Sequence, residues 1–91
     1  MKIYKNPWVR YDCYFLRTGN AYWAKNEASS STGYDIFFRD GAWSIRKSRY
    51  YNHTLKEMPV IAETIPIEKI VLNHVIDVIN EATGRADNGL D

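Results

Sequence analysis

The stretch YDIFFRDGAWSIRKSRYY, residues 34–51, decides the fold that we expect for this chain. Its centre, Asp40-Gly41, is a strong hairpin signal, because a two-residue type I′ turn needs positive φ at both central positions. The turn fixes a register in which Asp35 faces Arg46, an opposite-charge cross-strand pair that supports that register. One side of this hairpin then carries a coherent core face, made of Tyr34, Ile36, Phe38, Trp43 and Ile45.

A second hairpin is expected earlier in the chain, over residues 9–25. Its turn is predicted at Gly19-Asn20, since a two-residue Gly-Asn loop suits the mirror-image turns that strand twist favours. This turn would place Arg17 opposite Tyr22. The small polar residues 27–33 then predict a mobile loop between the two hairpins.

The C-terminal part of the chain predicts a helix over about residues 66–82. Pro66 suits its first turn, and Gly84 suits a left-handed cap just past its end. Apolar residues recur at helical spacing, but they cover more than half of the circumference, which is wider than the stripe of an ordinary surface helix. The helix is therefore expected to lie in a curved sheet or to touch a second chain as well.

Together these elements predict an α+β fold: an antiparallel β-meander of four or five strands packed against one C-terminal helix. Residues 60–64 are the candidate for a short edge strand after Pro59. Ninety-one residues make one domain, which we expect to span residues 1–84, with residues 85–91 as a flexible tail.

Charge is unevenly distributed along the chain, although the net charge is only +1. Residues 1–51 carry nine Lys/Arg and four Asp/Glu, whereas residues 52–91 carry three Lys/Arg and seven Asp/Glu. A basic half steers toward an acidic partner, and an acidic half opposes wrapping by nucleic acid. The single cysteine, Cys13, allows no disulfide within the chain and favours a reducing compartment. With no signal-like N-terminus and no apolar run near ~20 residues, we expect a cytoplasmic protein without a membrane partner.

The residues that carry chemistry are sparse. Two histidines and one cysteine, without short paired spacing, predict no metal site. Cys13 lies in an apolar strand pattern, where a buried thiol is the usual occupant, and no Gly-x-Ser-x-Gly elbow occurs. We therefore expect no catalysis and no cofactor.

The composition of the second hairpin instead indicates an interface, because aromatic residues and arginine dominate binding hot spots. The candidate partner-binding residues are Phe37, Arg39, Arg46, Lys47, Arg49, Tyr50 and Tyr51. An alternative is direct nucleic-acid binding by the same basic aromatic hairpin. The near-neutral net charge argues against it. The register also argues against it, because Arg46 and Tyr50 lie on one face and Lys47, Arg49 and Tyr51 on the other. A third alternative is a structural homodimer formed through helix 66–82.

No motif assigns the chain to a family. Its size, its lack of catalytic motifs, its aromatic hairpins and its lone cysteine are similar to those of small phage or mobile-element proteins that inhibit a host defence enzyme, of the anti-CRISPR or anti-restriction type. This likeness implies a protein partner, a host enzyme, and a location in the host cytoplasm.

Overall fold

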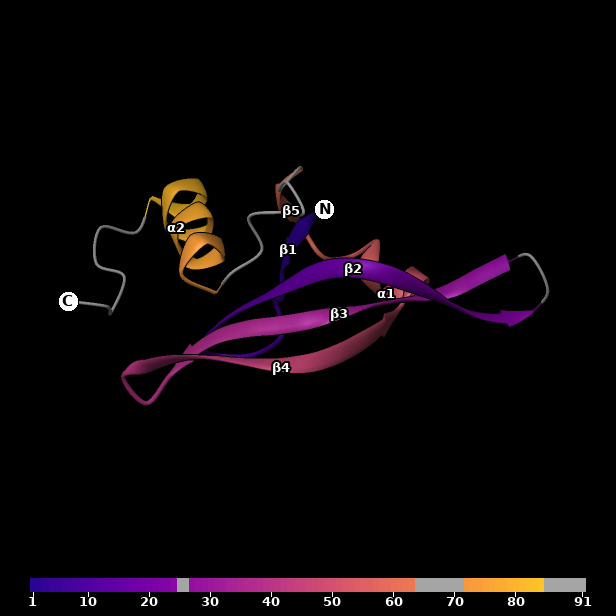
Figure 1. Cartoon of the computed structure of the whole chain (residues 1–91), viewed down its shortest axis with the longest axis horizontal. Helices are drawn as coiled ribbons and strands as arrows, with labels where there is room; N and C mark the ends of the chain where they lie inside the picture. Colours follow the sequence, from indigo (N-terminus) through magenta and orange to yellow (C-terminus); the bar gives the residue numbers. More distant parts are fainter. Residues whose placement is uncertain (25–26, 64–71, 85–91) are drawn as a thin grey trace.

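The computed structural model describes residues 1–24, 27–63 and 72–84, and its frame is one antiparallel sheet of five strands (Figure 1). The sheet order is β4-β3-β2-β1-β5. The elements are β1 (Ile3–Lys5), β2 (Asp12–Ala24), β3 (Glu27–Arg39), β4 (Ala42–Tyr51), α1 (Asn52–Leu55), β5 (Val60–Ala62) and α2 (Leu72–Thr83). Strands β1 to β4 are neighbours in chain order and β5 returns beside β1, so the predicted α+β meander is confirmed.

The hairpin of β3 and β4 has the predicted turn and register. Asp40 and Gly41 have φ values of 55° and 80°, as a type I′ turn requires. Asp35 lies opposite Arg46, and every pair from Arg39–Ala42 outward follows without a shift. The local turn signal was sufficient here because the strands on both sides also alternate in polarity.

The turn predicted at Gly19-Asn20 is wrong. Strand β2 continues through these residues, and they pair with Thr32 and Ser31 of β3. The polar residues 27–33, predicted as a loop, begin β3 instead, and the connection between β2 and β3 falls at residues 25–26, outside the described residues. The Gly-Asn pair is accommodated by a shift in register between Arg17 and Gly19 rather than by a reversal of the chain.

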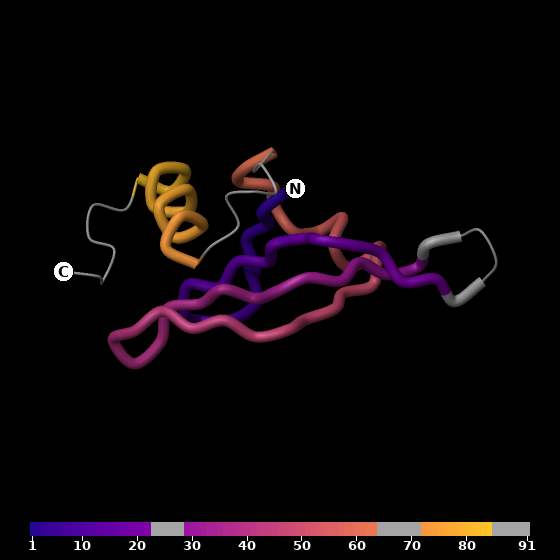
Figure 2. Tube along the Cα trace, in the orientation of Figure 1, coloured from indigo at the N-terminus to yellow at the C-terminus, as the bar shows by residue number. Residues whose placement is uncertain are grey.

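The paired strands β2 and β3 extend past the end of β4 (Figures 1 and 2). The last pair between β3 and β4 joins Ser30 to Tyr51, whereas β2 and β3 stay paired as far as Ala24 and Glu27. Strand β3 gives β2 a backbone partner along this length, with three shifts in register, and this outweighs the weak local turn preference.

The register shift in β2 depends on Gly33. A Cβ atom on Gly33 would lie 1.9 Å from the carbonyl oxygen of Leu16, closer than any real contact. Only glycine lets the two backbones approach this closely.

The sheet has a core cluster on each face. The side that carries Leu16 and Ile36, called the α2 face here, packs against α2, and its buried cluster comprises Ile3, Tyr14, Leu16, Ile36, Val75, Ile76 and Ile79. The opposite side, called the α1 face here, carries a smaller cluster of Phe15, Leu55 and Met58, against which Tyr4 and Tyr50 pack. A helical segment thus covers part of each face.

The predicted core face of the second hairpin is confirmed only in part. Ile36 is fully buried, and Tyr34, Phe38 and Trp43 are partly buried. Ile45 is 48% exposed, so its assignment to the core is wrong. Strand β4 lies at the edge of the sheet and contributes only Trp43 to the cluster under α2, which leaves Ile45 uncovered.

The C-terminal helix packs on the sheet as predicted. Of the predicted range 66–82, residues 72–82 are helical, and residues 66–71 and the tail 85–91 lie outside the described residues. The helix ends at Thr83, and Gly84 follows with a φ of 71°, the left-handed conformation expected of a glycine cap.

Replacing Gly33 by alanine should destabilise the protein by about 1–3 kcal/mol, because the new methyl group collides with backbone atoms that cannot move aside. Gly19→Ala is the matched control, since its Cβ would meet only the hydroxyl of Thr32, at 3.0 Å. Urea unfolding of both variants measures the difference. Equal destabilisation of the two would contradict the role of Gly33.

Candidate functional site

Strand β4 forms one edge of the sheet and borders only β3 among the described strands. It has ten residues, whereas β5 at the other edge has three. Its sequence, AWSIRKSRYY, contains three cations and no acidic residue. Long edge strands invite pairing with a further chain, and charged side chains along them restrict which chains pair.

The type I′ turn determines which backbone groups of β4 point outward. Residues that flank a two-residue turn, here Arg39 and Ala42, exchange hydrogen bonds with each other, and the bonding alternates from there. The amides of Ala42, Ser44 and Arg46 therefore point to β3. Those of Ile45 and Lys47 point away from the sheet.

The seven predicted partner-binding residues are divided between the two faces, as the register required. The α1 face carries Phe37, Arg39, Arg46 and Tyr50, and the α2 face carries Lys47, Arg49 and Tyr51. No single face brings all seven together. Five of them belong to the edge strand β4 and alternate between its two faces, and the other two belong to the neighbouring strand β3.

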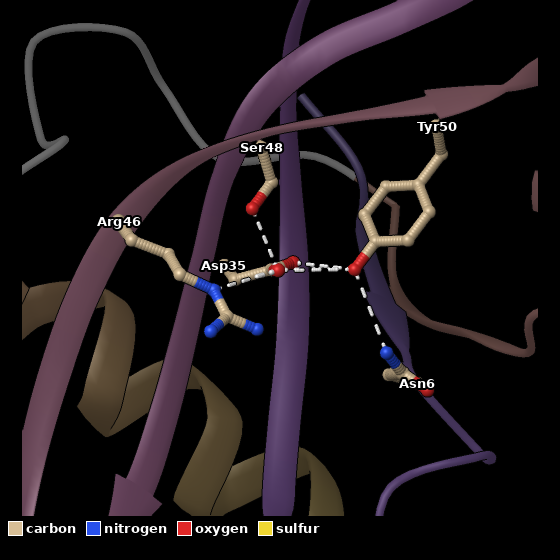
Figure 3. A network of polar contacts seen from close by, with 5 residues as sticks. All are labelled: Asn6, Asp35, Arg46, Ser48 and Tyr50. Atoms are coloured by element: carbon tan, nitrogen blue, oxygen red, sulfur yellow. Dashed lines mark hydrogen bonds and ion pairs between the residues drawn. The ribbon is translucent and has the colours of Figure 1, made fainter.

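On the α1 face, three β4 side chains converge on the buried carboxylate of Asp35 (Figure 3). The residue is only 2% exposed. Its Oδ2 atom accepts hydrogen bonds from Nε of Arg46 at 3.3 Å and from the Ser48 hydroxyl at 2.6 Å. The Tyr50 hydroxyl donates to both carboxylate oxygens, at 2.9 and 3.0 Å. All three of these donors to Asp35 belong to β4, the strand paired with it, so the network fixes β4 to β3 in one register.

Tyr50 is therefore a structural residue more than an exposed recognition residue. Its ring meets the buried ring of Phe15 edge-on, with centroids 4.7 Å apart. The amide of Asn6 donates to its hydroxyl at 3.5 Å. Burial raises the pKa of the Tyr50 phenol, and the hydrogen bond to Asp35 and the charge of Asp35 raise it further. The hydroxyl thus stays a proton donor to Asp35 throughout the physiological range.

Beyond Asp35, the α1 face carries a row in which two neighbouring rings lie between two guanidinium groups. The Arg39 guanidinium lies 5.1 Å from the Tyr11 ring, the Tyr11 and Phe37 rings are 5.8 Å apart, and the Arg46 guanidinium lies 4.8 Å from the Phe37 ring. Stacking of this kind orders long arginine side chains and leaves their charge accessible. Half of the Arg46 side chain remains exposed.

On the α2 face, Lys47 and Arg49 line a hollow of about 460 Å³ together with Thr18, Thr32, Gly33, Tyr34 and Ser48. Nε of Arg49 donates to the Ser30 hydroxyl at 2.9 Å. Lys47 is exposed and forms no ion pair with the described residues. Tyr51 stacks on His53 with centroids 5.4 Å apart and ring planes 9° from parallel.

Two residues of this region were not predicted from the sequence. Tyr11 directly precedes β2, and it contacts Phe37 because β2 pairs with β3. No local sequence pattern linked these two residues. Thr18 lines the hollow because β2 continues where a turn was expected. Both placements follow from the pairing of residues 12–24 with residues 27–39. A prediction of that pairing would have been needed to place Tyr11 and Thr18.

The described residues offer neither a metal-binding cluster nor a membrane-spanning helix. Within residues 1–24, 27–63 and 72–84, no three His, Cys, Asp or Glu side chains gather in a way that could hold a metal ion. In the same ranges, no helix has the length and apolar character that crossing a bilayer demands.

Comparison with known proteins gives no relative: no protein family matches the chain, and no curated protein or solved structure is significantly similar to it.

Replacing Asp35 by alanine should lower the free energy of unfolding by about 1–3 kcal/mol, because the half-exposed guanidinium of Arg46 and two hydroxyl donors lose their acceptor. Ser44→Ala, at an exposed position of the paired strand β4, should change it by about 0.5 kcal/mol or less. Chemical denaturation followed by tryptophan fluorescence measures both. A loss near that of the control would show that the network does not hold β4.

Stability should fall between pH 9 and 11 in a way that depends on Cys13. Burial, and after it the charge of Asp35, raises the pKa of the Cys13 thiol from 9.0 to about 11. In this window the unfolded chain binds fewer protons than the folded one, so stability is full below pH 9 and decreases as pH rises. Cys13→Ala should remove on the order of 2 kcal/mol of this decrease. Unfolding curves at several pH values test it, and parallel pH dependence in the two proteins would exclude the contribution.

Proposed function

We propose that this protein is a non-catalytic protein-binding module that takes an acidic, extended segment of a partner protein as an additional strand beside β4. The observation that carries the proposal is the character of that edge: ten residues in regular pairing on one side, with three cations and no acidic side chain. Main-chain hydrogen bonds supply affinity in such strand addition, and side chains on alternate sides supply specificity.

Strand addition explains how residues on opposite faces act on one ligand. A strand beside β4 would place its own side chains alternately on the two faces. Acidic side chains on the α1 face would meet Arg46, and those on the α2 face would meet Lys47. The Phe37 ring, which packs against the tilted ring of Tyr11, holds the first of these cations in place.

The same charges disfavour a second copy of this chain at that edge. Two β4 strands side by side would bring like charges together, which destabilises cross-strand pairs. A homodimer through the C-terminal helix is also disfavoured, because Val75, Ile76 and Ile79 of α2 are already buried against the sheet. These side chains are not available to a second chain. An acidic partner is the occupant that the charge pattern favours.

Direct binding of nucleic acid is the weaker alternative. Asp35 is in contact with Arg46, and the net charge of +1 gives little general attraction to phosphates. Inhibition of a host defence enzyme of the anti-CRISPR or anti-restriction type remains part of our proposal. It is supported by the small size of the chain and by its lack of catalytic motifs.

The test is amide hydrogen exchange of the labelled protein with a synthetic peptide of alternating valine and glutamate. Binding should protect the amides of Ile45 and Lys47, which point away from the sheet. Lys47→Glu should weaken binding about tenfold, since it replaces attraction by repulsion. Lys56→Glu is the matched control, because it changes the net charge equally at an exposed position outside β4.

Two results would overturn the proposal. One is peptide binding that leaves exchange at Ile45 and Lys47 unchanged. The other is a single-stranded oligonucleotide that binds more tightly than the peptide, with an affinity that falls steeply as salt rises, which would favour the nucleic-acid alternative.

A further inference from the structure

A second hollow, separate from β4, lies on the α1 face. Its volume is about 310 Å³, near the lower end of the ~300–1,000 Å³ typical of ligand pockets. Segments far apart in the sequence form it: β1, β2, β3, and the stretch from α1 to β5. We call it the Arg17 pocket, and it is lined by Lys2, Tyr4, Arg17, Ser31, Asn52, Leu55, Lys56, Met58 and Val60.

Three cations line this pocket without any carboxylate among the lining residues. Lys2 is 3.8 Å from Glu63, in a pair whose members are both largely exposed and weakly coupled. Arg17 and Lys56 form no ion pair with the described residues. Their charges therefore add in one small volume.

The Arg17 side chain is held in place for contact with a ligand. Its Nε atom donates to the Ser31 hydroxyl at 3.0 Å, and one terminal nitrogen donates to the amide oxygen of Asn20 at 2.5 Å. Ser31 is itself 1% exposed and donates to Asn52 at 2.8 Å. Two of the five N–H donors of the guanidinium are thus used, and three have no partner among the described residues.

The remaining wall of the pocket is apolar and partly aromatic. Leu55 and Met58 are buried in the cluster under α1, and the Tyr4 ring packs against that of Phe15 with centroids 6.3 Å apart. Val60 is 39% exposed at the mouth. A cationic rim beside a fixed ring and aliphatic side chains suits a ligand that joins an anionic group to a flat apolar one.

We propose that the Arg17 pocket binds a small phosphomonoester that carries a planar ring, of the mononucleotide class. The phosphate would accept hydrogen bonds from the unused donors of Arg17, and the positive charges of Lys56 and Lys2 would attract it. Guanidinium and ammonium groups commonly bind phosphate in these two ways. The ring would lie against Tyr4 and the aliphatic wall. This site is independent of the strand addition proposed for β4.

Titration of the labelled full chain with AMP tests the proposal through backbone amide shifts. Binding should shift the signals of Arg17, Ser31 and Asn52 and leave those of β4 residues 43–47 unchanged. Inorganic phosphate should bind at the same residues about tenfold more weakly, because it cannot use the ring wall, and adenosine should bind more weakly as well.

Lys56→Gln should weaken AMP binding at least about threefold, since it removes one of three cations. Its side chain makes no hydrogen bond or ion pair with the described residues, so the fold should be unaffected. Lys47→Gln, in the hollow on the other face, is the matched control and should leave the affinity unchanged.

Three results would overturn the proposal. The first is the absence of shifts around Arg17 at about 10 mM AMP, roughly ten times a weak dissociation constant of about 1 mM. The second is equal affinity for AMP and inorganic phosphate, which would remove the role of the ring. The third is an affinity that does not change in Lys56→Gln.

Discussion

The buried carboxylate of Asp35 is the constraint on which the outer half of the sheet depends. A charge at 2% exposure is tolerated only when donors surround it, and Arg46, Ser48 and Tyr50 supply them from alternate positions of one strand. A slip of β4 by one residue would turn these donors to the other face and leave the charge unpaired. The network therefore contributes more to a unique register than to net stability.

That register in turn determines what the edge presents to solvent. Because Asp35 holds Arg46 and Tyr50 on the α1 face, the intervening Lys47 must point to the α2 face. The edge strand thus displays positive charge on both faces. Repulsion between these charges disfavours pairing of β4 with a second copy of itself. The residues that stabilise the hairpin and those proposed to select a partner are consecutive in the same strand.

Sequence reasoning was successful where local signals and side-chain alternation agreed. Asp40-Gly41 predicted the turn, the register and the pairing of Asp35 with Arg46, all of which the structure shows. It was wrong where a local signal competed with long-range pairing. Gly19-Asn20 has the composition of a turn, but β2 continues through it because β3 offers a full-length partner, with Gly33 permitting the close approach.

The candidate sites were harder to predict than the fold. The hairpin residues could be assigned to faces, but the contact of Phe37 with Tyr11 and the gathering of Lys2, Arg17 and Lys56 depend on strands separated in the chain. The exposure of Ile45 depends on where α2 lies across the sheet. Periodicity within one segment carries no information about the placement of another.

The core cluster on the α2 face has a consequence for the order in which the protein folds. Ile3 is buried in one cluster with Val75, Ile76 and Ile79, which follow it about seventy positions later in the chain. Strand β1 therefore cannot be covered until α2 has been synthesised, whereas the hairpin of β3 and β4 needs only its own residues. During translation the hairpin of β3 and β4 would therefore be able to close while Ile3 of β1 still lacks its cover from α2.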